Sequence, residues 1–128
     1  MKKLFISCPM EGRTEQEIKE SIEKMKKIAE IYEGEELELI DSYIEQNPPQ
    51  NCNKGIWYLG ESLKKLSEAD VFIGIDDYYG WKGCCAEHEV AMKYGIKYHE
   101  VKVTSVIPNY RELIESTYET TKIGCTLI

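Results

Sequence analysis

The sequence predicts an α/β protein, a three-layer sandwich with helices on both faces of a central parallel sheet of four to five strands. Short apolar segments alternate along the chain with longer segments whose apolar residues recur at helical spacing. Residues 70–75 (DVFIGI) are apolar almost throughout, which is typical of a parallel strand covered on both faces. Strands that alternate with helices form right-handed βαβ units. The 128 residues suit one domain, spanning 1–128.

The first third of the chain predicts a strand, a helix and a second strand. Residues 2–7 suit a buried first strand that ends in a small-residue turn. Thr14 and Glu17 have the spacing of a capping box, so a helix begins after Thr14. Gly34 can end that helix, and the alternating residues 36–41 (ELELID) predict the second strand.

A long connection and two further strand–helix pairs follow. Residues 45–53 form a long loop, and loops of this kind are often functional. The remaining predicted elements are a helix over 56–69, the strand 70–75, a helix over 84–94 with Gly95 after it, a strand over 96–103, and a helix that Pro108 and Asn109 open and that runs through Tyr118. The tail 123–128 suits a fifth strand or a contact between subunits.

Charge and hydropathy narrow the possible partners. The net charge of −7 and the interleaving of Lys24, Lys26 and Lys27 with glutamates disfavour binding to a nucleic acid polymer. No apolar run approaches the roughly 20 residues of a membrane helix, so we expect no membrane association. The apolar part of the N-terminus is too short for a signal peptide, and the expected location is cytoplasmic. A small nucleoside remains a possible ligand.

The five cysteines lack the Cys-x-x-Cys spacing of zinc or thioredoxin sites, and we expect reduced thiols and no metal. Cys8 and Arg13 have four residues between them, whereas a phosphatase loop needs five, so that activity is rejected. Cys84 and Cys85 either pack a turn or, near a helix N-terminus, include a reactive thiol. His88 and His99 have no metal-ligand spacing, and we expect surface or edge positions for both. These residues give no cofactor or metal site.

The candidate site lies at the carboxyl ends of the strands, where ligands bind in parallel sheets of this kind. Two turns leave those ends with unusual chemistry, Ser7 to Arg13 and Asp76 to Glu87. Glu87 falls in the first part of a helix, where the helix dipole favours a charged carboxylate. Such a carboxylate either serves only as a dipole partner or attacks an anomeric carbon. Glu89 should point elsewhere.

Three segments resemble one protein family. Residues 3–12 (KLFISCPMEG), 62–71 (SLKKLSEADV) and 83–91 (GCCAEHEVA) resemble the opening strand and turn, the helix-to-strand stretch and the Glu-bearing turn of nucleoside 2-deoxyribosyltransferase-like proteins. Their order and spacing span roughly residues 2–103. The resemblance implies a flavodoxin-like fold, a homodimer or higher homo-oligomer, no cofactor, and cleavage or exchange of the N-glycosidic bond of a (deoxy)nucleoside.

The resemblance also assigns residues. Glu87 corresponds to the family's nucleophile, and Ser62 to the Asp that protonates the base. Phe5 replaces a tyrosine, and Trp81 replaces an Asp or Ser. The missing acid is then supplied by Glu61, Asp76 or Asp77. The residues expected to bind substrate are Phe5, Cys8, Met10, Gly12, Trp57, Tyr78, Trp81 and Gly83.

Two other functions remain open. The first is a catalytically inactive sensor or sequestering protein that binds a nucleoside or nucleotide derivative, which the loss of three polar family positions favours. The second is an oligomeric scaffold, because aromatic residues such as Trp57 and Tyr79 are as common in cores and interfaces as in base-stacking sites. Pro9 and Glu11 in the first loop favour an uncharged nucleoside over a monophosphate.

Overall fold

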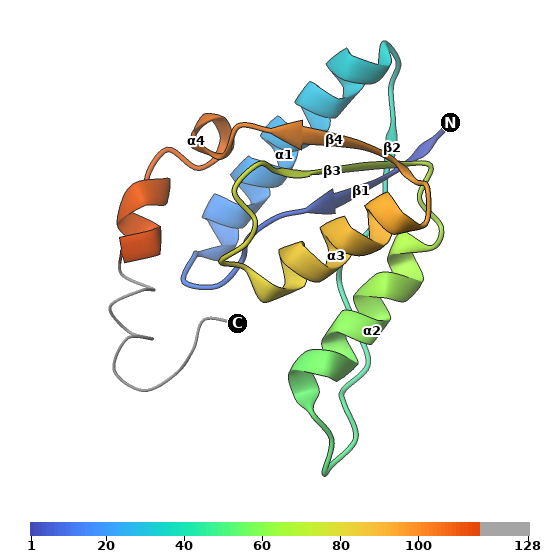
Figure 1. Cartoon of the computed structure of the whole chain (residues 1–128), viewed down its shortest axis with the longest axis vertical. Coiled ribbons are helices and arrows are strands. Elements are labelled where there is room, and N and C mark those ends of the chain that lie inside the picture. The colour runs from blue at the N-terminus through green and yellow to red at the C-terminus, as the bar shows by residue number, and fades with distance from the viewer. Residues whose placement is uncertain (116–128) are drawn as a thin grey trace.

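Parallel strands in the order β2-β1-β3-β4 form the central sheet of the computed structural model, which describes residues 1–115 (Figure 1). The strands are β1 (Lys3–Ser7), β2 (Glu38–Leu39), β3 (Val71–Ile75) and β4 (Lys97–Val101). The helices are α1 (Glu15–Glu33), α2 (Lys54–Leu66), α3 (Lys82–Lys93) and α4 (Val103–Val106), and residues 110–115 are also helical. The predicted α/β three-layer architecture is confirmed, and the strand order is that of flavodoxin-like sheets.

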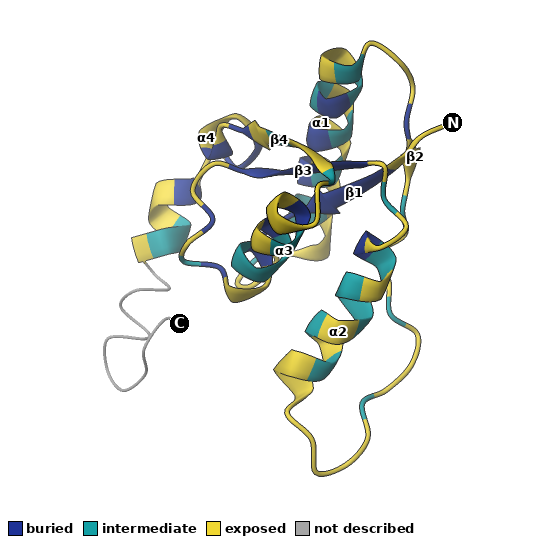
Figure 2. Cartoon of the chain, turned by 45° about the vertical axis from the view of Figure 1, so that its right-hand side comes forward, coloured by how far each residue is buried: buried dark blue, intermediate teal, exposed yellow. Residues whose placement is uncertain are grey.

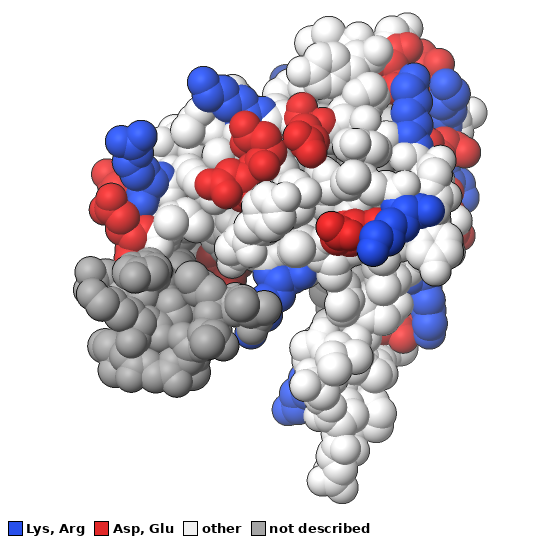
Figure 3. All heavy atoms as spheres, in the orientation of Figure 1, with Lys and Arg blue, Asp and Glu red and all other residues white. Residues whose placement is uncertain are grey.

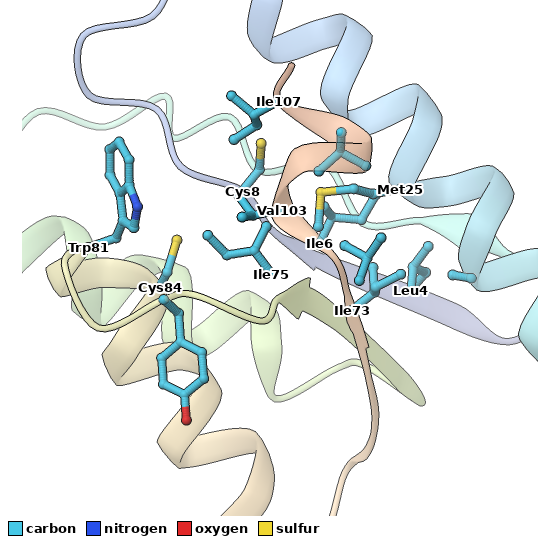
Figure 4. Close-up of a cluster of buried hydrophobic side chains, with 14 of the residues drawn as sticks. Leu4, Ile6, Cys8, Met25, Ile73, Ile75, Trp81, Cys84, Val103 and Ile107 are labelled. Carbon is cyan, nitrogen blue, oxygen red and sulfur yellow. The ribbon is translucent and has the colours of Figure 1, made fainter. Parts of the chain in front are cut away.

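Alternation along β1 and β3 divides the core between the two faces of the sheet. Leu4 and Ile6 point toward α1 and share a cluster with Ile73 (Figure 4). Phe5 and Phe72 pair in register on the opposite face and pack with side chains of α2 and α3. The sheet is therefore covered on both sides, as its continuous apolar strands predict.

Helix α1 begins and ends as its sequence predicts. The Thr14 hydroxyl accepts a hydrogen bond from the Glu17 amide at 3.1 Å, and the Glu17 carboxylate accepts one from the Thr14 amide at 3.1 Å. At the other end Gly34 adopts φ 72°, and its amide donates to the Glu30 carbonyl at 2.8 Å. Between them Met25 and Ala29 are fully buried against the sheet.

Helix α2 touches the rest of the molecule mainly through its C-terminal end. Leu66 is its one buried residue, whereas Ile56 near its start is 67% exposed. Figures 1 and 2 show the N-terminal half of α2 extending beyond the sheet, with the preceding segment of residues 42–53 running beside it. The Lys65 ammonium donates to the Asp41 carbonyl at 2.8 Å and so connects α2 to the chain that precedes this segment. The long loop predicted over 45–53 therefore forms one side of an extension.

Several predicted boundaries differ from the structure. Only Glu38 and Leu39 of the predicted strand 36–41 pair with β1, because this is an exposed edge strand. The fourth strand stops at Val101, and the chain then turns into α4, which the sequence did not predict. Helix α3 begins at Lys82, two residues earlier than expected. Tyr118 and the tail 123–128 lie outside the described residues.

The expectation that His88 lies at the surface is wrong. Its side chain is 1% exposed, because α3 turns Cys84, His88 and Ala91 toward the sheet at helical spacing. The ring stacks on Tyr78 with centroids 4.0 Å apart, and its Nε2 lies 3.1 Å from a carboxylate oxygen of Glu100. Neighbouring aromatic rings therefore bury His88, although histidine is a residue of only intermediate burial in most proteins.

His99 occupies the edge position that the sequence predicts. It lies on β4, at the edge of the sheet, and its Nε2 is 2.6 Å from the Glu33 carboxylate of α1. Within residues 1–115 no helix is both long and apolar enough to cross a membrane.

Replacing Thr14 with alanine should lower the free energy of unfolding by about 1 kcal/mol, because the Glu17 amide loses its capping acceptor. Chemical denaturation monitored by circular dichroism measures the change. Thr104→Ala is the matched control, since Thr104 is exposed within α4 and caps no helix. Equal losses in the two variants would contradict a capping role for Thr14.

Candidate functional site

A pocket of about 570 Å³ lies at the carboxyl end of β1, next to β3. Its walls come from the loop after β1, the segment that follows β2, the helix α2 and the start of α3. Figure 3 shows α2 standing apart from the body of the molecule, with the surface hollowed beside it. The connection after β1 runs to one face of the sheet and the connection after β3 to the other, so the pocket occupies the topological switch point.

Glu87 is held by hydroxyl groups from two different elements. Ser7 at the end of β1 donates to Oε1 at 2.8 Å, and Ser62 of α2 donates to Oε2 at 2.5 Å. Both carboxylate oxygens of this α3 residue are thereby fixed while each keeps further acceptor capacity. All three side chains belong to one hydrogen-bonded group, and Ser62 and Glu87 line the pocket.

The positions of the two serines follow from strand and helix periodicity. Ser7 lies two residues after Phe5, so both point to the face of the sheet that α3 covers. Ser62 lies four residues before Leu66, the buried residue of α2, and therefore faces the body of the molecule. Secondary structure alone thus brings the two hydroxyls to Glu87.

Burial raises the pKa of the Glu87 carboxyl above its ordinary value. The hydrogen bonds from Ser62 and then Ser7 act in the opposite direction, because they stabilise the charged form. Desolvation is the larger influence, so the folded protein binds a proton at Glu87 more tightly than an exposed glutamate would. The same desolvation leaves the ionised carboxylate poorly solvated and basic.

Two cysteines of the site are packing residues. Cys8 and Cys84 are both buried, and Figure 4 shows them within the apolar cluster near Trp81. Burial raises the pKa of the Cys8 thiol and raises the pKa of Cys84 to about 12. Both therefore stay protonated at neutral pH, which supports the packing role rather than a reactive thiolate at Cys84.

The pocket brings together seven of the predicted site residues. The seven that line it are Phe5, Cys8, Met10, Ser62, Trp81, Gly83 and Glu87. The other five, Gly12, Trp57, Asp76, Asp77 and Tyr78, are not part of the lining.

The two aspartates secure the loop after β3 instead. Asp76 accepts a hydrogen bond from the Val103 amide at 3.0 Å, and the carbonyl of Asp77 accepts one from the Tyr110 hydroxyl at 3.0 Å. Tyr78 stacks on His88, away from the lining. Gly12 adopts φ 75°, which suits the turn before α1 rather than a substrate contact.

Sequence reasoning missed several lining residues. Alternation from Phe5 is a signal that places Ser7 beside Glu87. Glu11 lies within the first loop, where the sequence alone indicates only a charge that repels phosphate. Tyr58, one of the aromatic residues that the sequence suggests for base stacking, does line the pocket. Lining residues not predicted as site residues include Ile6, Pro9, Glu11, Ser42, Ile44, Gly55, Leu59, Gly80 and Lys82. Ser42 and Ile44 gave no local signal, because the pocket gathers them from the segment before α2.

Within residues 1–115 no group of three or more His, Cys, Asp or Glu side chains is arranged to hold a metal ion. Comparisons with protein-family models, with curated proteins and with solved structures found no match for this chain. The geometry of the pocket and the chemistry of Glu87 are therefore the basis for assigning a function.

Replacing Glu87 with glutamine should raise the melting temperature relative to wild type increasingly as the pH rises from acid to neutral. The folded-state pKa of Glu87 is raised, so its stabilising contribution is complete below the unfolded pKa and is lost as pH rises through the folded pKa. Glutamine has no such titration. Thermal melts at a series of pH values measure the difference.

Glu89→Gln is the control, because Glu89 lies on the same helix but is exposed and pairs with Lys93. Its melting temperature relative to wild type should not increase toward neutral pH. If the Glu87→Gln difference were constant or fell as pH rises, the pocket would stabilise the carboxylate and the assigned direction would be wrong.

Proposed function

We propose that the protein cleaves or exchanges the N-glycosidic bond of a (deoxy)nucleoside, with Glu87 as the nucleophile. The observation behind this proposal is the Glu87 carboxylate, oriented by Ser7 and Ser62 beside a pocket of about 570 Å³. A pocket of this volume is within the range of small-molecule sites. Water or a second base then resolves the glycosyl ester.

The geometry supports a nucleophilic role through orientation and desolvation. Each hydroxyl engages one oxygen of Glu87, so the carboxylate is fixed and the remaining lone pairs stay available. An oriented nucleophile avoids the entropy cost of finding its attack position. Partial burial removes water that would otherwise solvate and weaken it.

The walls of the pocket favour a flat heterocycle. Phe5, Tyr58 and Trp81 contribute aromatic rings, and apolar side chains such as Leu59 and Met10 complete much of the lining. Aromatic faces stack on nucleobases with little regard to base identity. Within residues 1–115 the lining has two carboxyl groups, Glu11 and Glu87, against the single ammonium group of Lys82, so an uncharged nucleoside remains the proposed substrate.

A nucleoside-binding protein without catalysis is the second candidate, and one observation favours it. The Ser62 hydroxyl is engaged by Glu87, and Asp76 and Asp77 lie outside the pocket lining. The two aspartates that the sequence suggests as proton donors therefore do not line the pocket. Such a pocket could hold a nucleoside and leave its glycosidic bond intact.

Glu87→Gln should reduce base release by roughly 10⁴-fold or more, as expected when a nucleophile is removed. The assay incubates the protein with deoxynucleosides and ribonucleosides, with and without a second free base, and follows free base by chromatography. Glu89→Gln should retain wild-type turnover. Wild-type turnover by Glu87→Gln would eliminate the catalytic proposal, and a ligand-dependent melting shift without any product would favour the binding protein.

Ser62→Ala should move the acid limb of the kcat/KM profile to higher pH. The Ser62 hydroxyl lowers the pKa of Glu87 by stabilising the carboxylate, so its removal raises that pKa further. The catalyst must be ionised, and activity is therefore lost as pH falls through the pKa. Ser7→Ala should shift the limb in the same direction by less, and unchanged limbs in both variants would contradict the nucleophilic role.

A further inference from the structure

We propose that Glu11 is the acid–base residue of this site: it protonates the departing base and then activates the water or acceptor that releases the sugar from Glu87. This inference rests on the proposed function and adds the residue that the catalytic cycle lacks. Departure of an unprotonated base anion is difficult, and general acid catalysis typically contributes about 10²–10⁴-fold.

Glu11 and Glu87 are the only carboxyl-bearing residues that line the pocket within residues 1–115. The alternatives considered from the sequence are used elsewhere. Asp76 binds the Val103 amide, and Glu61, whose side chain is 23% exposed, pairs with Lys64 at 2.9 Å and is not part of the pocket lining. Besides Glu87, Glu11 is therefore the one carboxyl group of residues 1–115 in the pocket lining.

The environments of the two lining carboxyl groups suit two different roles. Glu87 is partly buried and receives hydrogen bonds from Ser7 and Ser62, which orient its charged form. Glu11 is exposed and has no ion pair or hydrogen bond to another side chain of residues 1–115. Paired carboxyls in unlike environments commonly divide nucleophilic and acid–base work.

The backbone that bears Glu11 is nevertheless held in place. The Arg13 amide donates to the Met10 carbonyl at 3.2 Å and closes the turn around Glu11. The Arg13 guanidinium donates to the Pro9 carbonyl at 2.9 Å and to the Ser21 hydroxyl of α1 at 2.5 Å. The loop is thus anchored on both sides of Glu11, whose side chain is exposed.

In the proposed reaction the sugar passes first to Glu87 and then to water. A carboxylate oxygen of Glu87 forms a bond to the anomeric carbon as the bond from that carbon to the base nitrogen breaks, and the bonding electrons move to the base. The Glu11 carboxyl gives its proton to the base and becomes a carboxylate. That carboxylate then takes a proton from water as the water oxygen bonds to the anomeric carbon and the Glu87 ester bond breaks. Both residues return to their starting states.

The test compares Glu11→Gln with wild type on two substrates. The first is an ordinary purine deoxynucleoside, and the second is its 7-methyl derivative, whose cationic base leaves as a neutral molecule without protonation. In single-turnover measurements, base release from the ordinary substrate should fall about 10²–10⁴-fold, and release from the 7-methyl substrate should change by less than about tenfold. Glu15→Gln removes a charge from exposed α1 and should change neither rate.

A second readout follows the glycosyl ester on Glu87. Glu11→Gln should accumulate this ester with the 7-methyl substrate, seen as an added sugar mass on the protein, and added azide should release a glycosyl azide. Equal losses on both substrates, or no loss on the ordinary one, would overturn the role of Glu11 and leave Glu87 as nucleophile. No base release from either substrate by wild type would overturn the proposed function and this inference with it.

Discussion

The pocket depends on the two hydrogen bonds that the Glu87 carboxylate accepts, because they join β1, α2 and α3 at one point. A desolvated carboxylate costs free energy unless hydrogen bonds compensate it. Ser7 and Ser62 supply that compensation from two elements that are far apart in sequence. Leu66 is the one buried residue of α2, so the Ser62 bond is a second point at which α2 meets the rest of the molecule, beside the pocket.

The strand order explains why this group forms beside a usable surface. Placing β1 next to β3 brings the loop that bears Glu11 beside the loop that leads to Glu87. Neither loop needs to be long, because the sheet itself supplies the proximity. The long connection is instead the segment 42–53, which runs beside the projecting part of α2 and contributes Ser42 and Ile44 to the pocket wall. The two sides of the pocket are therefore attached differently. The loops after β1 and β3 belong to the sheet, whereas α2 and the segment 42–53 form an extension.

Local patterns predicted most of the fold and the position of Glu87, because both depend on short-range periodicity and capping. Thr14, Gly34 and the apolar run 70–75 specify their elements through contacts within a few residues. The burial of His88 was not predictable in this way, since it depends on rings of Tyr78 and Tyr98 that the fold assembles around it. The role of Asp76 was not predictable from local patterns either. Functional residues are common at the carboxyl ends of strands, but Asp76 accepts a hydrogen bond from the Val103 amide of α4, a helix that the sequence did not predict.

Ser62 has two opposite effects on the proposed catalyst: it favours ionisation of Glu87, and it leaves the position without a proton donor. A second carboxylate so close to Glu87 would repel its charge and raise its pKa further, whereas the Ser62 hydroxyl stabilises the ionised form. The same serine cannot donate a proton to a leaving base at a useful rate, because a hydroxyl is a very weak acid. A site built this way gains a more readily ionised nucleophile, and the proton for the leaving base must come from another lining residue. The exposed position of Glu11 on the anchored first loop meets that requirement, since the proton can be replenished from solvent without disturbing the Ser7–Glu87–Ser62 group.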